Sequence, residues 1–183
     1  TTFPELAKAV IKLNDGFSGE GNAVFSFEGA PGNEYLQLWI KEILPNRLQI
    51  VANDLVYASF MDKFRMMGGI VEAYIDGEQK AFPSVQCRVT PLGETDVIST
   101  HDQFLGGESG QVFLGGHFPA NKEYSIAIGE LGKRITEKLK SYGVLGRFSI
   151  DFVSTKENNE WKHFAIEINL RKGGTTHPYL MLQ

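Results

Sequence analysis

The sequence has little cysteine and no long apolar run. Its single cysteine, Cys87, excludes an internal disulfide and is typical of a protein from a reducing compartment. No stretch approaches the roughly 20 consecutive apolar residues of a membrane-spanning helix, and the segment 1–4 lacks the charged and apolar regions of a secretory signal. We therefore expect a cytoplasmic protein that does not bind membranes.

The chain also lacks a strong excess of charge of either sign. Its formal net charge is -4 at pH 7 and it contains no block of lysines and arginines. Such a chain has no electrostatic field that would hold a nucleic acid through its phosphates, so any phosphate binding must be local. The four histidines have no zinc-ligand spacing with Cys87, which argues against transition-metal catalysis.

Helical and strand-like patterns alternate along the 183 residues, without internal repeats or low-complexity linkers. This organisation predicts an α+β fold. Strands are expected at 8–13, 23–27, 48–51, 70–75, 84–89, 96–100, 111–114, 147–153 and 161–169. Helices are expected from 33 up to Pro45, which should end that helix, and over 55–66 and 121–142. Gly129 and Gly132 lower helix propensity in the last of these, so we expect them to permit close packing against a sheet.

The final hairpin carries the most informative polar pattern. Alternation puts Asp151 on one face of its strand, and it puts Ala165, Glu167 and Asn169 together on one face of the next strand. If the polar turn 155–160 centres near Asn159, Asp151 lies opposite Glu167, where two carboxylates repel unless a cation lies between them. Oxygen ligands of this kind suit Mg²⁺. A solvated polar face on an edge hairpin explains the same pattern without a metal.

A glycine-rich turn follows the first strand. Glycines at positions 16, 19 and 21 allow backbone N–H groups to approach an anion. Lys12 should lie on the strand face opposite Ile11 and Leu13, beside this turn, where its ammonium can meet phosphate oxygens. A plain flexible hairpin turn is the alternative interpretation.

A third candidate element is the apolar strand that runs into the turn 72–77. Backbone groups at a strand end can pair with the edge of an adenine, while Tyr74 or Ile75 flanks the ring.

Together these pieces resemble the ATP-grasp superfamily: a lysine strand, a glycine-rich loop, a Glu-x-x-Ile hinge, an Asp strand and a Glu-x-Asn strand, in that order. Four sequence motifs are similar to those of the carboxylate-amine ligase branch that contains the pheganomycin-type peptide ligases. They lie at 84–86 (SVQ), 100–103 (THDQ), 115–120 (GGHFPA) and 167–178 (EINLRKGGTTHP). The resemblance implies two α+β lobes, at 1–78 and 79–183, built on mostly antiparallel sheets with the nucleotide between them.

The resemblance also implies roles for individual residues. Lys12 would contact ATP phosphates, and the loop of Ser18, Gly19, Glu20, Gly21 and Asn22 would fold over them. Glu72, Ala73, Tyr74 and Ile75 would cradle adenine, and Glu78 would take the ribose hydroxyls. Asp151, Glu167 and Asn169 would hold Mg²⁺, with Mn²⁺ as a substitute. Arg171 would reach the transferred phosphate, and Arg88 is a second phosphate candidate whose alternative is an ion pair across the sheet.

The activity that the resemblance implies is ATP-dependent joining of a small carboxylate to an amine, an amino acid or a peptide, through an acyl phosphate. A non-amine acceptor and a nucleotide-binding module without ligase activity are the alternatives. ATP-grasp enzymes carry a further lysine and an N-terminal domain before the segment that begins here, so we expect a fragment that has no ligase activity alone. Many relatives also have an arginine where this sequence has Ser149, which places more of the phosphate stabilisation on Arg171 or Arg88.

Overall fold

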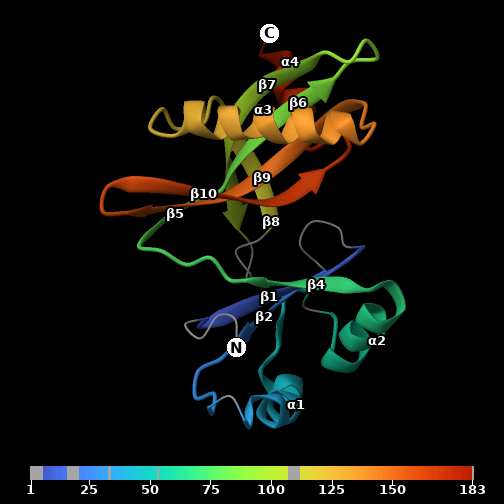
Figure 1. Ribbon diagram of the computed structural model, residues 1–183, viewed down its shortest axis with the longest axis vertical. Helices are drawn as coiled ribbons and strands as arrows, with labels where there is room; N and C mark the ends of the chain where they lie inside the picture. The colour runs from blue at the N-terminus through green and yellow to red at the C-terminus, as the bar shows by residue number, and fades with distance from the viewer. Residues whose placement is uncertain (1–5, 16–20, 33, 53, 107–111, 183) are drawn as a thin grey trace. The chain divides into compact units, whose positions relative to one another are not determined.

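The computed structural model describes residues 6–15, 21–32, 34–52, 54–106 and 112–182. The described residues divide into two compact units, one containing residues up to Tyr74 and the other containing Ile75–Gly106 and the residues from Phe113 onward. Each unit has its own antiparallel sheet with helices (Figure 1), which confirms the predicted α+β class. Within these ranges, no helix is long and apolar enough to cross a membrane.

The first unit is a four-stranded sheet with two helices. The strand order is β3-β2-β1-β4, and every pair is antiparallel. Its elements are β1 (Lys8–Leu13), β2 (Asn22–Ser26), α1 (Leu36–Arg47), β3 (Gln49–Ile50), α2 (Tyr57–Met67) and β4 (Gly69–Ala73). Phe25 is buried and its ring contacts Trp39 of α1 at a centroid distance of 5.9 Å, while α2 contributes the fully buried Phe60.

Pro45 does not end α1, contrary to the prediction, because the helix continues to Arg47 with Pro45 inside its last turn. A proline lacks one N–H donor and crowds the preceding turn. At this position the loss affects a single hydrogen bond close to a helix end, and Leu48 N still donates to Leu44 O at 3.0 Å. The helix therefore ends two residues later than the sequence predicts.

The second unit is a six-stranded sheet. Strands follow one another in the order β10-β9-β6-β7-β8, and β5 pairs with the outer half of β9. Its elements are β5 (Gln79–Ala81), β6 (Pro83–Val89), β7 (Thr95–Gly106), β8 (Val112–His117), α3 (Ser125–Ser141), β9 (Gly146–Glu157), β10 (Glu160–Asn169) and α4 (Thr176–Met181). Neither β5 nor α4 was predicted, since three and six residues are too few for a periodic pattern.

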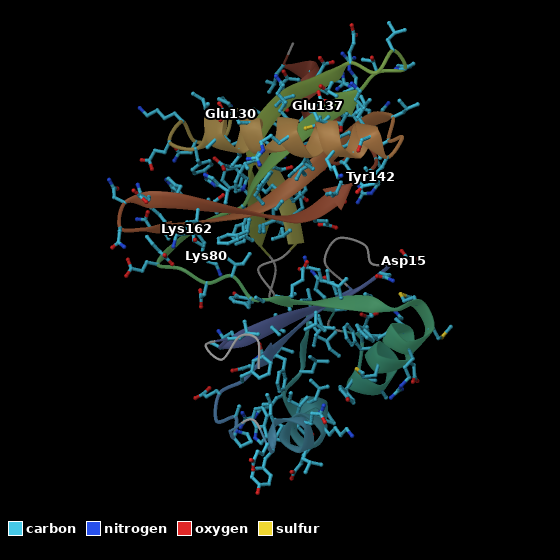
Figure 2. All side chains as sticks on the ribbon, viewed as in Figure 1. Asp15, Lys80, Glu130, Glu137, Tyr142 and Lys162 are labelled. Carbon is cyan, nitrogen blue, oxygen red and sulfur yellow. The ribbon has the colours of Figure 1, made fainter. Side chains whose placement is uncertain are left out.

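Helix α3 lies across one face of this sheet (Figure 1) and buries its apolar side there. Ile128 is fully buried, whereas Glu130 and Glu137 are on the exposed side (Figure 2). Gly132 allows the approach, since a Cβ at this position would come within 2.8 Å of Val85 Cγ1. Gly129 has only an ordinary contact, 3.9 Å from its would-be Cβ to Thr100, so the prediction of close packing is confirmed for one glycine of the two.

The β9–β10 hairpin is longer than predicted and contains a bulge. Its turn is only Asn158 and Asn159, both with positive φ (49° and 65°), as tight two-residue hairpin turns require. The polar turn predicted over 155–160 is therefore wrong, because both strands pair up to Glu157 and Glu160. The register shifts once, between Ala165 and Glu167. Ile166 is the extra residue of this β-bulge.

The bulge reverses the side-chain alternation of β10. Ala165 pairs with Phe152 of the core face, whereas Glu167 pairs with Asp151 on the opposite face. The prediction that Ala165 shares a face with Glu167 and Asn169 is therefore wrong. The predicted pairing of Asp151 with Glu167 is confirmed.

Candidate functional site

The face of the second sheet opposite α3 carries a row of polar residues. Asp151 in β9 lies directly between Glu167 of β10 and Ser84 of β6. Asn169 is one pleat further along β10, and its Nδ2 donates to Asp151 Oδ2 at 3.0 Å. The three residues predicted to hold a metal are therefore neighbours within one unit.

Asp151 is an unusual carboxyl group. Its pKa is raised to about 6, mainly by burial and also by the charge of Glu167, although the Ser84 hydroxyl, the charge of Arg171 and the hydrogen bond from Asn169 act to lower it. A carboxyl group in this position ionises at a cost, which a bound cation would remove.

The donor set fits a hard cation such as Mg²⁺. Two carboxylates and one amide oxygen are ligands that Mg²⁺ accepts, with water and phosphate oxygens in its remaining positions. Asn169 would coordinate the ion through its Oδ1. The side-chain amide would therefore have to rotate, because in this structure its Nδ2 points toward Asp151 and donates a hydrogen bond to it. Within the described ranges, no group of three or more His, Cys, Asp and Glu side chains could hold a metal ion. The third protein ligand at this site would therefore have to be an amide.

The segment after β10 folds back over the same face. Arg171 is exposed, close enough to Asp151 for its charge to lower the pKa of that carboxyl. Gln86 Nε2 donates to the carbonyl oxygen of Thr175 at 3.2 Å, and Gly173 N donates to Thr176 Oγ1 at 3.1 Å. The first bond holds the Gly-Gly-Thr-Thr loop against the middle of β6, and the second closes the loop on itself.

In the first unit, the predicted phosphate lysine has a carboxylate partner. Lys12 Nζ lies 2.6 Å from Glu72 Oε2, across the β1–β4 pair, and both side chains are partly exposed. Strand alternation puts them on the face opposite Ala9, Ala23 and the other core residues, as predicted. Glu72 therefore positions the ammonium group, a role that the sequence did not suggest for it.

Only the end of the predicted phosphate loop is described. Ser18, Gly19 and Glu20 lie outside the described residues. Gly21 and Asn22 close the base of the loop, where Leu13 N donates to Gly21 O at 2.9 Å and Lys12 pairs with Asn22.

The predicted adenine hinge spans the boundary of the two units. Glu72 and Ala73 end β4, Tyr74 is the last residue of the first unit, and Ile75 begins the second. The Tyr74 N–H donates to Lys8 O at 3.0 Å, and the Lys8 ammonium lies 5.4 Å from the centre of the Tyr74 ring. Glu78 is exposed at the bend before β5.

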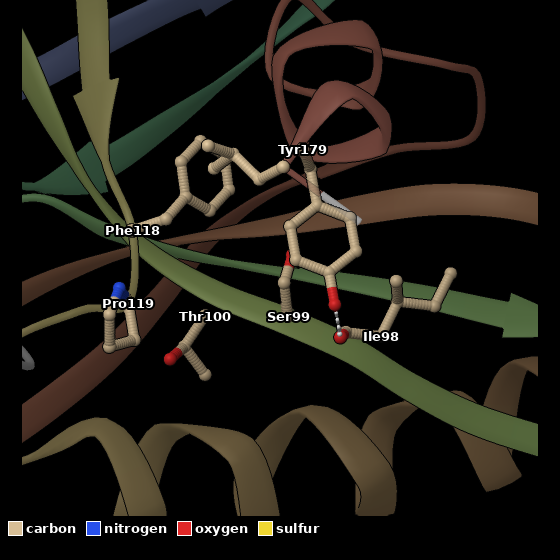
Figure 3. Close-up of a pocket in the computed structure, with 7 residues that line it drawn as sticks. Ile98, Ser99, Thr100, Phe118, Pro119 and Tyr179 are labelled. Carbon is tan, nitrogen blue, oxygen red and sulfur yellow. Dashed lines mark hydrogen bonds between the residues drawn. The ribbon is translucent and has the colours of Figure 1, made fainter.

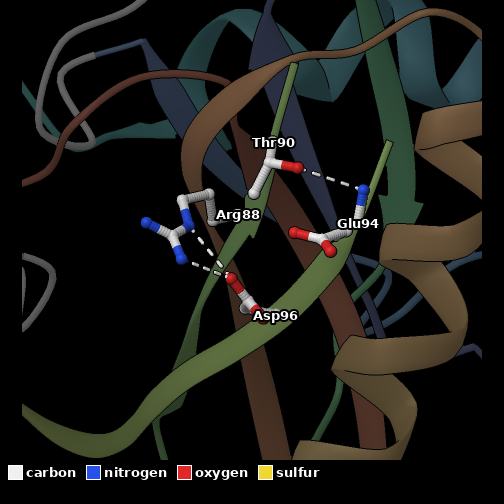
Figure 4. Close-up of polar contacts among 4 residues, drawn as sticks. All are labelled: Arg88, Thr90, Glu94 and Asp96. Atoms are coloured by element: carbon white, nitrogen blue, oxygen red, sulfur yellow. Dashed lines mark hydrogen bonds and ion pairs between the residues drawn. The ribbon is translucent and has the colours of Figure 1, made fainter. Parts of the chain in front are cut away.

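Arg88 is engaged in an ion pair rather than standing alone. Its Nε and Nη2 lie 3.0 and 2.6 Å from Asp96 Oδ2 on β7 (Figure 4). This contact is the alternative that the sequence left open. It leaves Nη1 outside the pair, so the contact does not prevent Arg88 from binding an anion.

Sequence reasoning missed a buried histidine in the same row as Asp151. His101 of β7 pairs with Ser84 and is 1% exposed. Burial lowers its pKa to about 4, although the neighbouring Asp102 acts to raise it. Its Nδ1 has no hydrogen-bond partner within the described residues. A lone histidine in an alternating strand gives no signal of its burial, which depends on the packing of α4 and Phe118.

The pocket beside this histidine is apolar. The His101 ring stacks on Phe118 at 4.9 Å, and Phe118 in turn contacts Tyr179 of α4 at 5.6 Å. Tyr179 Oη donates to the Ile98 carbonyl at 3.0 Å (Figure 3). The pocket has a volume of about 380 Å³ and is lined by Ile98, Ser99, Thr100, Phe118, Pro119, Tyr179 and Leu182.

A family model and two relatives match the sequence. The model described as IQCH-like, ATP-grasp matches residues 34–175. An L-propargylglycine--L-glutamate ligase of Streptantibioticus cattleyicolor is 35% identical over 118 residues, which are 64% of this chain and 23% of that ligase. IQ motif-containing protein H of Danio rerio is 26% identical over 116 residues, 62% of this chain and 11% of that protein. The chain thus spans less than a quarter of either relative.

Solved structures share the fold at low sequence identity. The biotin carboxylase domain of the Hydrogenobacter thermophilus 2-oxoglutarate carboxylase superposes with a TM-score of 0.63 at 16% identity, covering 98% of this chain and 34% of that one. N5-carboxyaminoimidazole synthetase of Staphylococcus aureus, solved with ADP, has a TM-score of 0.60 at 13% identity, covering 98% of this chain and 39% of that one. At such identities the likeness concerns the fold alone.

Proposed function

The chain belongs to the IQCH-like ATP-grasp family, and on that premise we propose that it is the ATP-binding and Mg²⁺-binding part of a ligase that joins a carboxylate to an amine. The observation that carries the proposal is the pairing of Asp151 with Glu167 beside Asn169. The 35% identity to an amino-acid ligase supports the amine acceptor. Since the chain covers 23% of that ligase, the activity is proposed for the complete protein.

Asp151, Glu167 and Asn169 would hold the ion, with Mn²⁺ as a substitute. When bound, Mg²⁺ supplies neutralisation of phosphate charge and a template for in-line transfer. The bulge at Ile166 contributes to this role, because it turns Glu167 and Asn169 toward the face that carries Asp151.

The remaining residues would bind and orient the nucleotide. Lys12 would exchange its ion pair with Glu72 for ATP phosphate oxygens, which keeps the ammonium paired in both states. The loop of Ser18, Gly19, Glu20, Gly21 and Asn22 would cover the phosphates. Glu72 to Ile75 would present backbone groups to adenine, with Ala73 and Tyr74 at the strand end, and Glu78 would bind ribose. Arg88 would bind a further anion, either an ATP phosphate or an anionic group of the substrate.

Arg171 would act on the group that is transferred. In the first step a substrate carboxylate oxygen bonds to the γ-phosphorus while the bond to the β-phosphate oxygen breaks, giving an acyl phosphate and ADP. In the second, the amine nitrogen bonds to the acyl carbon, inorganic phosphate leaves and the nitrogen loses a proton. A planar guanidinium two residues beyond Asn169 can donate paired, charge-assisted hydrogen bonds to the phosphate oxygens.

Glu167→Gln in the full-length protein tests this proposal. It keeps the size of the side chain and removes the charge opposite Asp151, so amine-dependent ADP release should fall by about 100-fold to 1000-fold, as for the loss of one electrostatic contact in a transition state. Glu160→Gln, at the exposed start of the same strand, is the matched control and should retain activity. Equal activities for the two variants would refute the metal assignment.

The same assay tests the acceptor. ADP release should depend on an added amine, and thiols, hydroxyl compounds and bicarbonate should not replace it. Release that depends on one of these instead would assign a different acceptor, and nucleotide binding without release would assign a binding module.

A further inference from the structure

The polar face of the second sheet continues past the acidic row to a pair of arginines. Arg88 of β6 lies directly opposite Arg147 of β9, so both side chains project from the face that carries Asp151. Arg147 precedes Asp151 by four residues on the same strand, which corresponds to about 13 Å. The acids and the arginines thus occupy two separate sites on one face.

Among the described residues, the arginine pair has one carboxylate for two guanidinium groups. Asp96 binds Arg88 through Nε and Nη2 (Figure 4). The Arg88 side chain is 44% exposed and the Asp96 side chain 42% exposed, so water screens this ion pair. No salt bridge joins Arg147 to a carboxylate of the described residues, and its Nη1 is buried without a hydrogen-bond partner among them. Like charges directly opposite on a sheet repel, and buried donors are nearly always paired.

We propose that Arg88 and Arg147 together bind an oxyanion, and that this anion is a carboxylate of the amino-acid or peptide substrate. The proposal rests on the ligase function proposed above. The planar guanidinium group of Arg147 matches a carboxylate in bidentate geometry, and the anion would supply the missing partner of Nη1 and offset the repulsion between the two arginines.

The spacing favours a substrate carboxylate over a nucleotide phosphate. Phosphate oxygens that share the Mg²⁺ ion with Asp151 lie about 2 Å from that ion, whereas the arginines are about 13 Å further along the strand. An amino acid or short peptide can extend over this span, with its reacting group near the acids and its free carboxylate on the arginines. Arg88 then recognises the substrate rather than ATP.

Arg147→Met in the full-length protein tests the site by equilibrium binding and by turnover. The probes are the proteinogenic amino acids, the C-terminal amide of each, inorganic phosphate and an ATP analogue with Mg²⁺. For the amino acid that binds best, the variant should raise Kd and KM tenfold or more, the scale of one lost hydrogen bond to a charged group. The amide should bind the variant and the native protein alike, and the KM for ATP should not change.

Two further variants separate a lost ligand contact from damaged folding. Arg134→Met, on the exposed side of α3, is the matched control and should bind like the native protein. Asp96→Asn removes the carboxylate that competes for Arg88, so amino-acid binding should become severalfold tighter, a gain that damage would not produce.

The outcomes distinguish the two proposals. If Arg147→Met weakens the amide as much as the acid, or raises the KM for ATP or the Kd of inorganic phosphate alone, the anion is not a substrate carboxylate and the inference is overturned. If no amino acid of the panel binds the native protein, the inference is overturned as well. If amino acids bind through Arg147 but no ADP is released, the ligase proposal fails while the carboxylate site stands.

Discussion

Two glycines of helix α3 should respond in opposite directions to the same substitution. Ala is favoured over Gly in a helix interior by about 1 kcal/mol, a gain available at both Gly129 and Gly132. At Gly129 the new methyl group meets Thr100 at 3.9 Å, an ordinary contact. At Gly132 it comes within 2.8 Å of Val85 Cγ1. Val85 is fully buried and its β-branched side chain has little rotamer freedom.

The net effects follow from these terms. Overpacking of this kind costs about 1–3 kcal/mol, so Gly132→Ala should destabilise the protein by about 1 kcal/mol after the propensity gain. Gly129→Ala should stabilise it by up to about 1 kcal/mol. The difference of about 2 kcal/mol corresponds to roughly 4–8 °C in Tm for a domain of this size.

Urea unfolding followed by circular dichroism measures both variants, with the slope of the transition as a check that the unfolded state is unchanged. Midpoints that rise equally for Gly129→Ala and Gly132→Ala would refute the claim that Gly132 is required for the approach of α3 to β6. The same packing supports Ser84, which neighbours Asp151, so Gly132→Ala should also weaken the proposed Mg²⁺ binding relative to Gly129→Ala.

Three further predictions concern stability. Burial lowers the pKa of His101 to about 4, so between pH 6.5 and 4 this histidine is protonated in the unfolded chain but neutral in the folded protein. The free energy of unfolding should therefore fall by about 3 kcal/mol over this pH range. His101→Phe should reduce this loss, as measured by denaturant titrations at both pH values. Gly69→Ala should destabilise by about 3 kcal/mol because its Cβ would meet Lys12 O at 2.3 Å, whereas Gly32→Ala, with nothing within 4 Å, should leave Tm nearly unchanged. Asn159 has φ of 65°, so Asn159→Val should cost about 1–2 kcal/mol and Asn159→Gly much less; equal melting temperatures would contradict the turn assignment.

Much of the fold follows from local pattern. Alternation in β9 and the amphipathic stripe of α3 place these elements correctly because each buries one face on a large core. The predicted pairing of Asp151 with Glu167 is correct although its premise is not: counting from a centre at Asn159 gives the register of the site end of the hairpin, whereas the turn itself is centred between Asn158 and Asn159.

What the sequence could not predict depends on tertiary packing. The two-residue turn at Asn158 and Asn159 sets a register that would place Ile166 opposite Asp151, whereas the strands pair Glu167 with Asp151. The bulge at Ile166 produces this shift of one residue. No local propensity marks that bulge. It is required because Trp161 and His163 of the same strand contact Tyr124 near the start of α3, at 4.8 and 5.9 Å between ring centres, while Glu167 faces the other way.

The arginines show a similar limit. Alternation places Arg147 on the face of Asp151, but the partner of Arg88 depended on which residue of β7 lies across from it. Asp96 occupies that position because of a register shift between Gln86 and Cys87. The ion pair between Arg88 and Asp96 thus depends on an irregularity in the β6–β7 pairing, which no sequence pattern predicts.

The place of the Asp151–Glu167 pair, far from the hairpin turn and beyond the bulge at Ile166, has a consequence for folding. A hairpin that closes from its turn adds one residue pair after another, so the pairs nearest Asn158 and Asn159 form first. Glu167 meets Asp151 only after the strands have passed the bulge, when most of the inter-strand hydrogen bonds already exist. The repulsion between the two carboxylates is therefore delayed to the last steps of zipping, where it opposes little of the hairpin's formation and acts mainly on the finished site.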